Sequence, residues 1–180
     1  DGAAAVMLTR AELLPPNGPH PEIQIAGSSV ATDTLALHDR RDPLAFRAAR
    51  ISVSRACHQA EIDPKQADFF ELYDAFSVYA ALSLEAAGFA QPGQGWRLAE
   101  QGEIDLQGKI PIATMGGLKA RGNPWGATGI YQIVEAVLQL RGEAGENQIP
   151  GAQWGLVQSL GGPASTAITH VLHRNQGKKH

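Results

Sequence analysis

The stretch MGGLKARGNPWGATG, residues 115–129, contains five glycines and two cations in 15 positions. Such a composition predicts a loop rather than an ordinary helix or strand. Glycine lets a ligand approach the backbone closely, and a helix that begins after the loop presents unpaired N–H groups. Gly116 and Gly117 are therefore candidate substrate-binding residues. On the residues alone, a plain connector explains the loop equally well, and its spacing fits neither a P-loop nor a dinucleotide fingerprint.

The elements on either side must position this loop. Residues 110–113 are strand-like, and the broad apolar face of GIYQIVEAVLQLRG predicts a buried helix that begins near residues 128–130 and ends at Gly142. Apolar runs and alternation predict further strands at residues 3–9, 22–26 and 69–72. Apolar periodicity and capping signals predict further helices at residues 45–60, with Asp42 as N-cap, and at residues 77–87.

The remaining segments complete the order of elements. Residues 91–109 are rich in Gly and Gln, and we expect an irregular surface excursion there. WGLVQSL and STAITHVL are separated by GGP and predict an antiparallel hairpin. Strands that alternate with helices before a closing hairpin predict an α/β layered domain with a mixed sheet.

Composition excludes several classes of protein. The chain has 180 residues, 43% of them hydrophobic, which is enough for one sizeable core. A net charge of -3 with scattered cations argues against a nucleic-acid partner. The single cysteine, Cys57, excludes an internal disulfide, so a reducing cytoplasm is the default compartment. No apolar run approaches the ~18 residues of a membrane span, and the histidines have no metal-ligand spacing.

Four motifs carry a resemblance to a known family. The string GGLKARGNPWGATG resembles the Gly–His–Pro loop of thiolases, which there reads G-G-x-x-x-x-G-H-P-x-G-A-T-G and leads into a helix. DGAAAVML is similar to a strand near the middle of a thiolase chain, and ADFFELYDAF to the E-V-H-D-C/A-F strand of the sterol-carrier-protein type. WGLVQSLGGPASTAITHVL is similar to the closing hairpin. The motifs occur in the family's order and cover nearly the whole chain.

The resemblance implies a fold and a division of the chain. It implies a thiolase-like C-terminal half, a layered mixed β-sheet with packed helices, over residues 1–174. Residues 1–10 would form the last strand of the preceding half, and residues 175–180 a disordered polar tail. The N-terminal half of a thiolase is thus an implied partner, and a homo-oligomer is expected for the whole protein.

The resemblance also implies chemistry on acyl groups carried by coenzyme A, with the CoA thioester as substrate and no tightly bound cofactor. The family's nucleophilic cysteine belongs to the N-terminal half, so it is not expected in this chain. Two family histidines are expected here, and both are replaced, by Tyr73 and Asn123. An amide cannot act as a base in place of an imidazole, and a tyrosine acts mainly as a hydrogen-bond donor or general acid. The resemblance thus implies an acyltransferase that forms or cleaves carbon–carbon bonds on acyl-CoA, while the two replacements weigh against ordinary Claisen-type turnover.

The expected site is an oxyanion or enolate pocket. It would combine the Tyr73 hydroxyl, the Asn123 amide and backbone N–H groups near Gly161 and Gly162. A tyrosine at the first histidine position resembles the thiolase-like retro-aldolases, which cleave a β-hydroxyacyl-CoA by deprotonating its hydroxyl. Those enzymes work with a small partner of the zinc-ribbon/oligonucleotide-fold type, which the resemblance adds as a partner here.

Other interpretations of the same residues stay open. Tyr73 could be a core aromatic, and Asn123 could hold the loop through an Asx-type hydrogen bond. Asp74 is expected to cap the helix that begins near Ser77 rather than to act in catalysis. With both histidines replaced, the whole protein could also be a catalytically degenerate scaffold that binds acyl-CoA or a partner subunit.

Overall fold

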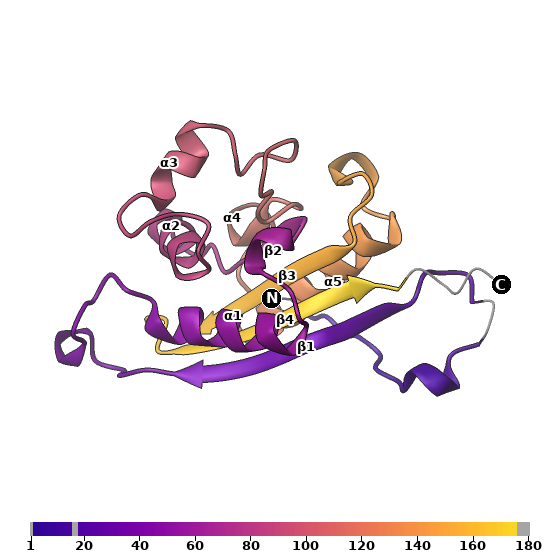
Figure 1. The fold of residues 1–180 in the computed structure, drawn as a ribbon, viewed down its shortest axis with the longest axis horizontal. Coiled ribbons are helices and arrows are strands. Elements are labelled where there is room, and N and C mark those ends of the chain that lie inside the picture. Colours follow the sequence, from indigo (N-terminus) through magenta and orange to yellow (C-terminus); the bar gives the residue numbers. More distant parts are fainter. Residues whose placement is uncertain (1, 16–17, 176–180) are drawn as a thin grey trace.

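A four-stranded mixed sheet organises the protein in the computed structural model, which describes residues 2–15 and 18–175 (Figure 1). The sheet has the order β1-β4-β3-β2. Its strands are β1 (Ile23–Thr32), β2 (Phe69–Glu71), β3 (Trp154–Gly161) and β4 (Thr166–Arg174). β4 pairs antiparallel with both β1 and β3, whereas β2 runs parallel to β3. The predicted hairpin and the predicted mixed α/β sheet are confirmed.

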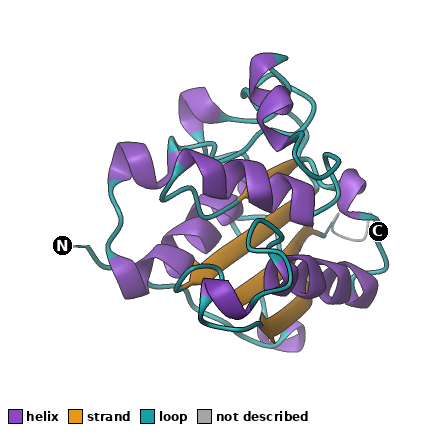
Figure 2. Ribbon diagram, turned by 90° about the vertical axis from the view of Figure 1, so that its left-hand side faces the viewer, coloured by secondary structure: helices purple, strands orange, loops and turns teal. Residues whose placement is uncertain are grey.

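Two long helices cover the two faces of the sheet. On one face α1 (Arg47–Gln59) packs against β1 and β4, and on the other α5 (Thr128–Arg141) packs against β3 (Figures 1 and 2). The strand alternation explains this layering, because neighbouring residues of a strand point to opposite faces. Phe70 and Leu156 belong to the cluster on the α1 side, while Phe69 and Val157 pack with α5.

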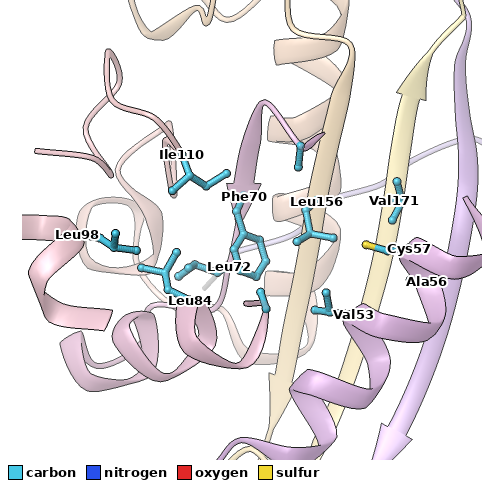
Figure 3. Packing of buried hydrophobic residues seen from close by; sticks show 12 residues of the cluster. Val53, Ala56, Cys57, Phe70, Leu72, Leu84, Leu98, Ile110, Leu156 and Val171 are labelled. Carbon is cyan, nitrogen blue, oxygen red and sulfur yellow. The ribbon is translucent and has the colours of Figure 1, made fainter. Parts of the chain in front are cut away.

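The largest core cluster lies between α1 and the sheet and continues under the helices beside β2 (Figure 3). Val53, Ala56 and Cys57 of α1 contribute to it from one side. Burial, together with the negative charge of Asp63, raises the pKa of the Cys57 thiol to about 11. Cys57 is therefore a small core residue rather than a nucleophile.

Three shorter helices lie on the β2 side of the sheet: α2 (Ser77–Ala86), α3 (Gly95–Glu100) and α4 (Gly117–Arg121) (Figure 1). The prediction of α2 is confirmed, but two predicted irregular segments contain helices. α3 interrupts the expected excursion at residues 91–109, and α4 occupies part of the glycine-rich stretch. Both helices are short, and both contain glycine, so neither has the long apolar period by which a helix is recognised in sequence.

Three predictions at element ends need correction. Residues 3–9 form no strand, so the assignment of residues 1–10 to the preceding half stays a prediction. Asp42 does not cap α1, because the N-cap of that helix is Phe46. The Asp42 carboxylate instead accepts from the Leu44 N–H in the turn before the helix. The expected disordered tail begins with an ordered residue, because Asn175 hydrogen-bonds to Glu22, and residues 176–180 lie outside the described part.

Among the described residues, no helix has the length and apolarity needed to cross a lipid bilayer. Within the same part of the chain, no group of three or more His, Cys, Asp or Glu side chains could hold a metal ion.

Candidate functional site

Three parallel segments end at one edge of the sheet, and the predicted site residues follow them. β2 and β3 run parallel, and a parallel bridge between Phe70 and Ile112 places the segment before the glycine-rich stretch beside β2. Parallel neighbours end at the same edge. Tyr73 comes two residues after β2, and Gly161 is the last residue of β3. In open α/β sheets ligands bind outside this carboxyl edge.

Asn123 and Tyr73 meet at this edge. The Asn123 amide Nδ2 donates to the Tyr73 hydroxyl oxygen at 3.0 Å, although 50 residues separate them in the chain. Tyr73 is half-buried against the hydrophobic cluster around Leu160 and Ala164, and Asn123 is exposed. The hydroxyl proton of Tyr73 is not used in this bond, so the phenol can still donate to, or exchange a proton with, a third group.

Two further hydrogen bonds fix which way the Asn123 amide faces. Its Oδ1 accepts from the Thr128 hydroxyl at 2.8 Å and from the Trp125 backbone N–H at 3.3 Å. With the carbonyl oxygen occupied by two donors, the amino group is the part that faces Tyr73. Asn123 thus holds the loop through the Trp125 N–H and also contacts Tyr73, while its part in an oxyanion or enolate pocket stays a prediction.

The glycine-rich stretch is folded around a buried carboxylate. Asp74 is 7% exposed and accepts from the Leu118 N–H at 2.8 Å. Gly117 has φ +60°, and a Cβ there would lie 2.3 Å from the Asp74 carboxylate. Asp74 therefore stabilises the start of α4 instead of capping α2, whose N-cap is Phe76. Gly116 is exposed and Gly117 is buried, and their binding of substrate stays a prediction.

Gly161 and Gly162 lie at the turn between β3 and β4. Gly161 lines a cavity of about 340 Å³ that Trp125 also lines, so this turn and the glycine-rich loop border one hollow. His170 lies in the same lining, and burial lowers the pKa of its imidazole. Both glycines are exposed, and a contribution of their N–H groups to an oxyanion pocket stays a prediction.

A buried carboxyl at the end of β2 was missed by the sequence reasoning. Glu71 is 1% exposed, and its Oε1 accepts from the Thr114 N–H at 3.0 Å and the Thr114 hydroxyl at 2.7 Å. Burial, aided by the charge of Glu135, raises the pKa of Glu71 to about 7, against the opposing effect of Thr114 and Arg121. An acidic residue inside the apolar run FFEL was the signal available in the sequence.

An ion pair fixes the other end of the loop. Arg121, the last residue of α4, donates to both carboxylate oxygens of Glu135 on α5, at 2.6 and 3.2 Å. Its Nη1 also donates to the Gly122 carbonyl at 3.3 Å, and its guanidinium lies over the Tyr131 ring. Because both charges are largely buried, this bidentate pair holds α4 to α5 next to Asn123.

The fold and the site define a class: a mixed α/β domain whose polar pair lies at the carboxyl edge of its parallel segments, beside the start of α5. The family described as "Thiolase C-terminal domain-like" matches residues 29–174. The chain therefore belongs to the thiolase family, as a domain like the C-terminal one.

Relatives agree with this assignment. The chain is 42% identical over 174 residues to an acetyl-CoA acetyltransferase of Methanothermobacter thermautotrophicus, covering 97% of this chain and 45% of the relative. It is 34% identical over 173 residues to sterol carrier protein 2 of Rattus norvegicus, covering 94% of this chain and 32% of the relative. The chain thus spans less than half the length of these curated relatives.

Solved structures share the fold. An Ltp2-ChsH2(DUF35) aldolase superposes with a TM-score of 0.78 at 23% identity, over 90% of this chain and 41% of the other. A monomeric SCP2-thiolase-like protein type 1 from Mycobacterium smegmatis gives a TM-score of 0.61 at 22% identity, over 84% and 28%. At these identities the likeness establishes the fold alone.

Proposed function

We propose that this chain is the C-terminal domain of an enzyme that cleaves or forms carbon–carbon bonds on coenzyme A thioesters, with Tyr73 as its acid/base. The observation that carries the proposal is the 3.0 Å hydrogen bond from Asn123 Nδ2 to the Tyr73 oxygen. An N–H donor aimed at an oxygen stabilises negative charge on it. The pair therefore suits a tyrosine that gives up and regains its proton.

The direction favoured by this pair is retro-aldol cleavage of a β-hydroxyacyl-CoA. The Tyr73 phenolate would take the proton of the β-hydroxyl, and the electron pair of that O–H bond would form a carbonyl as the Cα–Cβ bond breaks. The electrons of the broken bond would pass to the thioester as an enolate, which takes a proton at its α-carbon. N–H groups near Gly161 and Gly162 are the proposed donors to the enolate oxygen.

A second candidate is the acyl transfer named for the 42% identical relative, an acetyl-CoA acetyltransferase. In this candidate the CoA thioester is again the substrate, and the nucleophile would come from the N-terminal half. The N-terminal half, a homo-oligomer and a small zinc-ribbon/OB-fold subunit are the partners proposed for the whole protein. The small subunit is proposed from the fold shared with the Ltp2-ChsH2(DUF35) aldolase, whose name pairs two proteins.

The deciding experiment assays the full-length protein with β-hydroxyacyl-CoA and with β-ketoacyl-CoA plus coenzyme A, each with wild type and Tyr73→Phe. We expect cleavage of the β-hydroxyacyl substrate and a loss of roughly 10²-fold or more in the variant. Tyr79→Phe is the matched control, since Tyr79 belongs to the same cluster as Tyr73 and packs there on Phe46. Thiolysis that is unaffected by Tyr73→Phe would favour acyl transfer, and CoA-ester binding without turnover would favour a scaffold.

A further inference from the structure

We propose that Glu71 is a positioning residue of this site: through Thr114 it holds the glycine-rich segment so that Asn123 reaches Tyr73. The inference rests on the proposed function of the Tyr73–Asn123 pair. Glu71 does not approach that pair through any described hydrogen bond, so it would act through the segment and not on the substrate.

Three carboxylates hold the segment from Thr114 to Asn123 at its beginning, middle and end. Glu71 accepts two hydrogen bonds from Thr114 at its beginning. Asp74 accepts from Leu118 in its middle. The pair of Arg121 with Glu135 fixes its end. Glu71 and Asp74 lie on either side of Tyr73 in the sequence, so the short segment that carries the phenol also carries two of the three acceptors.

The hydrogen bonds to Thr114 require the burial of the Glu71 carboxyl, which costs free energy of hydration. A carboxyl that is 1% exposed loses its hydration, and a neutral glutamine could accept from Thr114 equally well by geometry. An ionised carboxylate, however, accepts shorter and stronger hydrogen bonds than an amide oxygen. A glutamate at position 71, rather than a glutamine, is therefore explained if its hydrogen bonds to Thr114 must be stronger than those that a neutral acceptor makes.

The charge around Glu71 makes this hold sensitive to pH. The charged groups that act on it are Arg121 from α4 and Glu135 from α5, and Thr114 is its neutral donor. The Glu71 pKa of about 7, raised mainly by burial, means that the carboxyl ionises near neutral pH. On ionisation it attracts both Thr114 donors and Arg121 more strongly, which tightens the segment on which Asn123 lies.

The test measures kcat/KM for the β-hydroxyacyl substrate in the full-length protein between about pH 5.5 and 8.5. Wild type should show a rise near pH 7 that is absent in Glu71→Gln. Thr114→Val, which removes the hydroxyl donor, should lower kcat/KM roughly 10-fold, and Thr114→Ser should stay within about twofold of wild type. Glu85→Gln is the matched control. Glu85 accepts a hydrogen bond from the Gly95 N–H at 2.8 Å, in a contact between α2 and α3 that does not involve Thr114.

A rise near pH 7 that persists unchanged in Glu71→Gln overturns the inference while leaving the proposed reaction intact. If wild type shows no turnover, amide hydrogen exchange of residues 114–123 decides instead. We expect faster exchange of this segment in Glu71→Gln and in Thr114→Val, with the amides around Gly95 unaffected. Equal exchange in wild type and both variants also overturns it.

Discussion

The Asn123 amide donates to the Tyr73 hydroxyl oxygen across 3.0 Å, at the edge where the parallel segments end. The resemblance predicts a histidine at each of these two positions, and the structure brings the tyrosine and the asparagine that stand there into contact. This hydrogen bond restrains both side chains, the half-buried phenol of Tyr73 and the exposed amide of Asn123. Predictions about the site can therefore be tested on either partner.

Asn123→Asp should abolish the proposed role of Tyr73 while preserving the shape of the loop. The new carboxylate can still accept from Thr128, but it offers no N–H to the phenol oxygen, so Tyr73 must keep its proton to donate to it. We expect kcat/KM for the β-hydroxyacyl substrate to fall roughly 10²-fold, with little change in the urea midpoint. Full activity in Asn123→Asp would show that the amide donor is not needed.

Thr128→Val tests the orientation of the amide separately. It removes the hydroxyl that donates to Asn123 Oδ1 at 2.8 Å and keeps nearly the same volume in a fully buried position. The amide then has one fixed donor instead of two, and we expect an intermediate loss of about 10-fold in kcat/KM. Thr128→Ser, which keeps the hydroxyl, should restore the rate. An unchanged rate in Thr128→Val would mean that Trp125 alone fixes the amide.

The sequence contained enough to predict the family and most of the elements. Apolar periodicity and turn residues are features of short stretches of sequence. They therefore predicted the hairpin, α5 with its end at Gly142, and β2 followed by α2. Tyr73 and Asn123 were paired through the family motif, since nothing local links residues 50 positions apart. Glu71, the Arg121–Glu135 pair and the binding of Asp74 to Leu118 are contacts between distant segments, which periodicity does not encode.

Gly117→Ala should destabilise the domain more than Gly142→Ala. Both glycines have positive φ, at +60° and +81°, so alanine costs roughly 1 to 2 kcal/mol of conformational free energy at either site. A Cβ at Gly142 meets nothing within 4 Å, whereas one at Gly117 would lie 2.3 Å from the Asp74 carboxylate. Urea unfolding should show the larger loss at Gly117. Equal losses would mean that α4 shifts freely away from Asp74.

Cys57 should not react with thiol reagents in the folded protein. The side chain is 2% exposed, and its pKa of about 11 leaves almost no thiolate at pH 7 to 8. We expect labelling of Cys57 to follow global unfolding, and Cys57→Ala to retain turnover in the full-length protein with a modest loss of stability. Rapid labelling under native conditions would show that α1 opens locally from the sheet.

The stability of the domain should depend on pH through Glu71, with a sign that follows from its raised pKa. Between the ordinary value of 4.5 and about 7, the unfolded chain has lost the Glu71 proton and the folded chain keeps it. Folding then binds a proton, so the free energy of unfolding contributed by this group is greatest below pH 4.5 and declines as the pH rises toward 7. The decline amounts to at most about 3 kcal/mol. The free energy of unfolding, measured with urea, should change less between pH 4.5 and 7 in Glu71→Gln than in wild type. Glu85→Gln should show the same pH dependence as wild type. Parallel curves for wild type and Glu71→Gln would mean that Glu71 is ionised throughout, and that its hold on Thr114 already operates at full strength in mildly acidic solution.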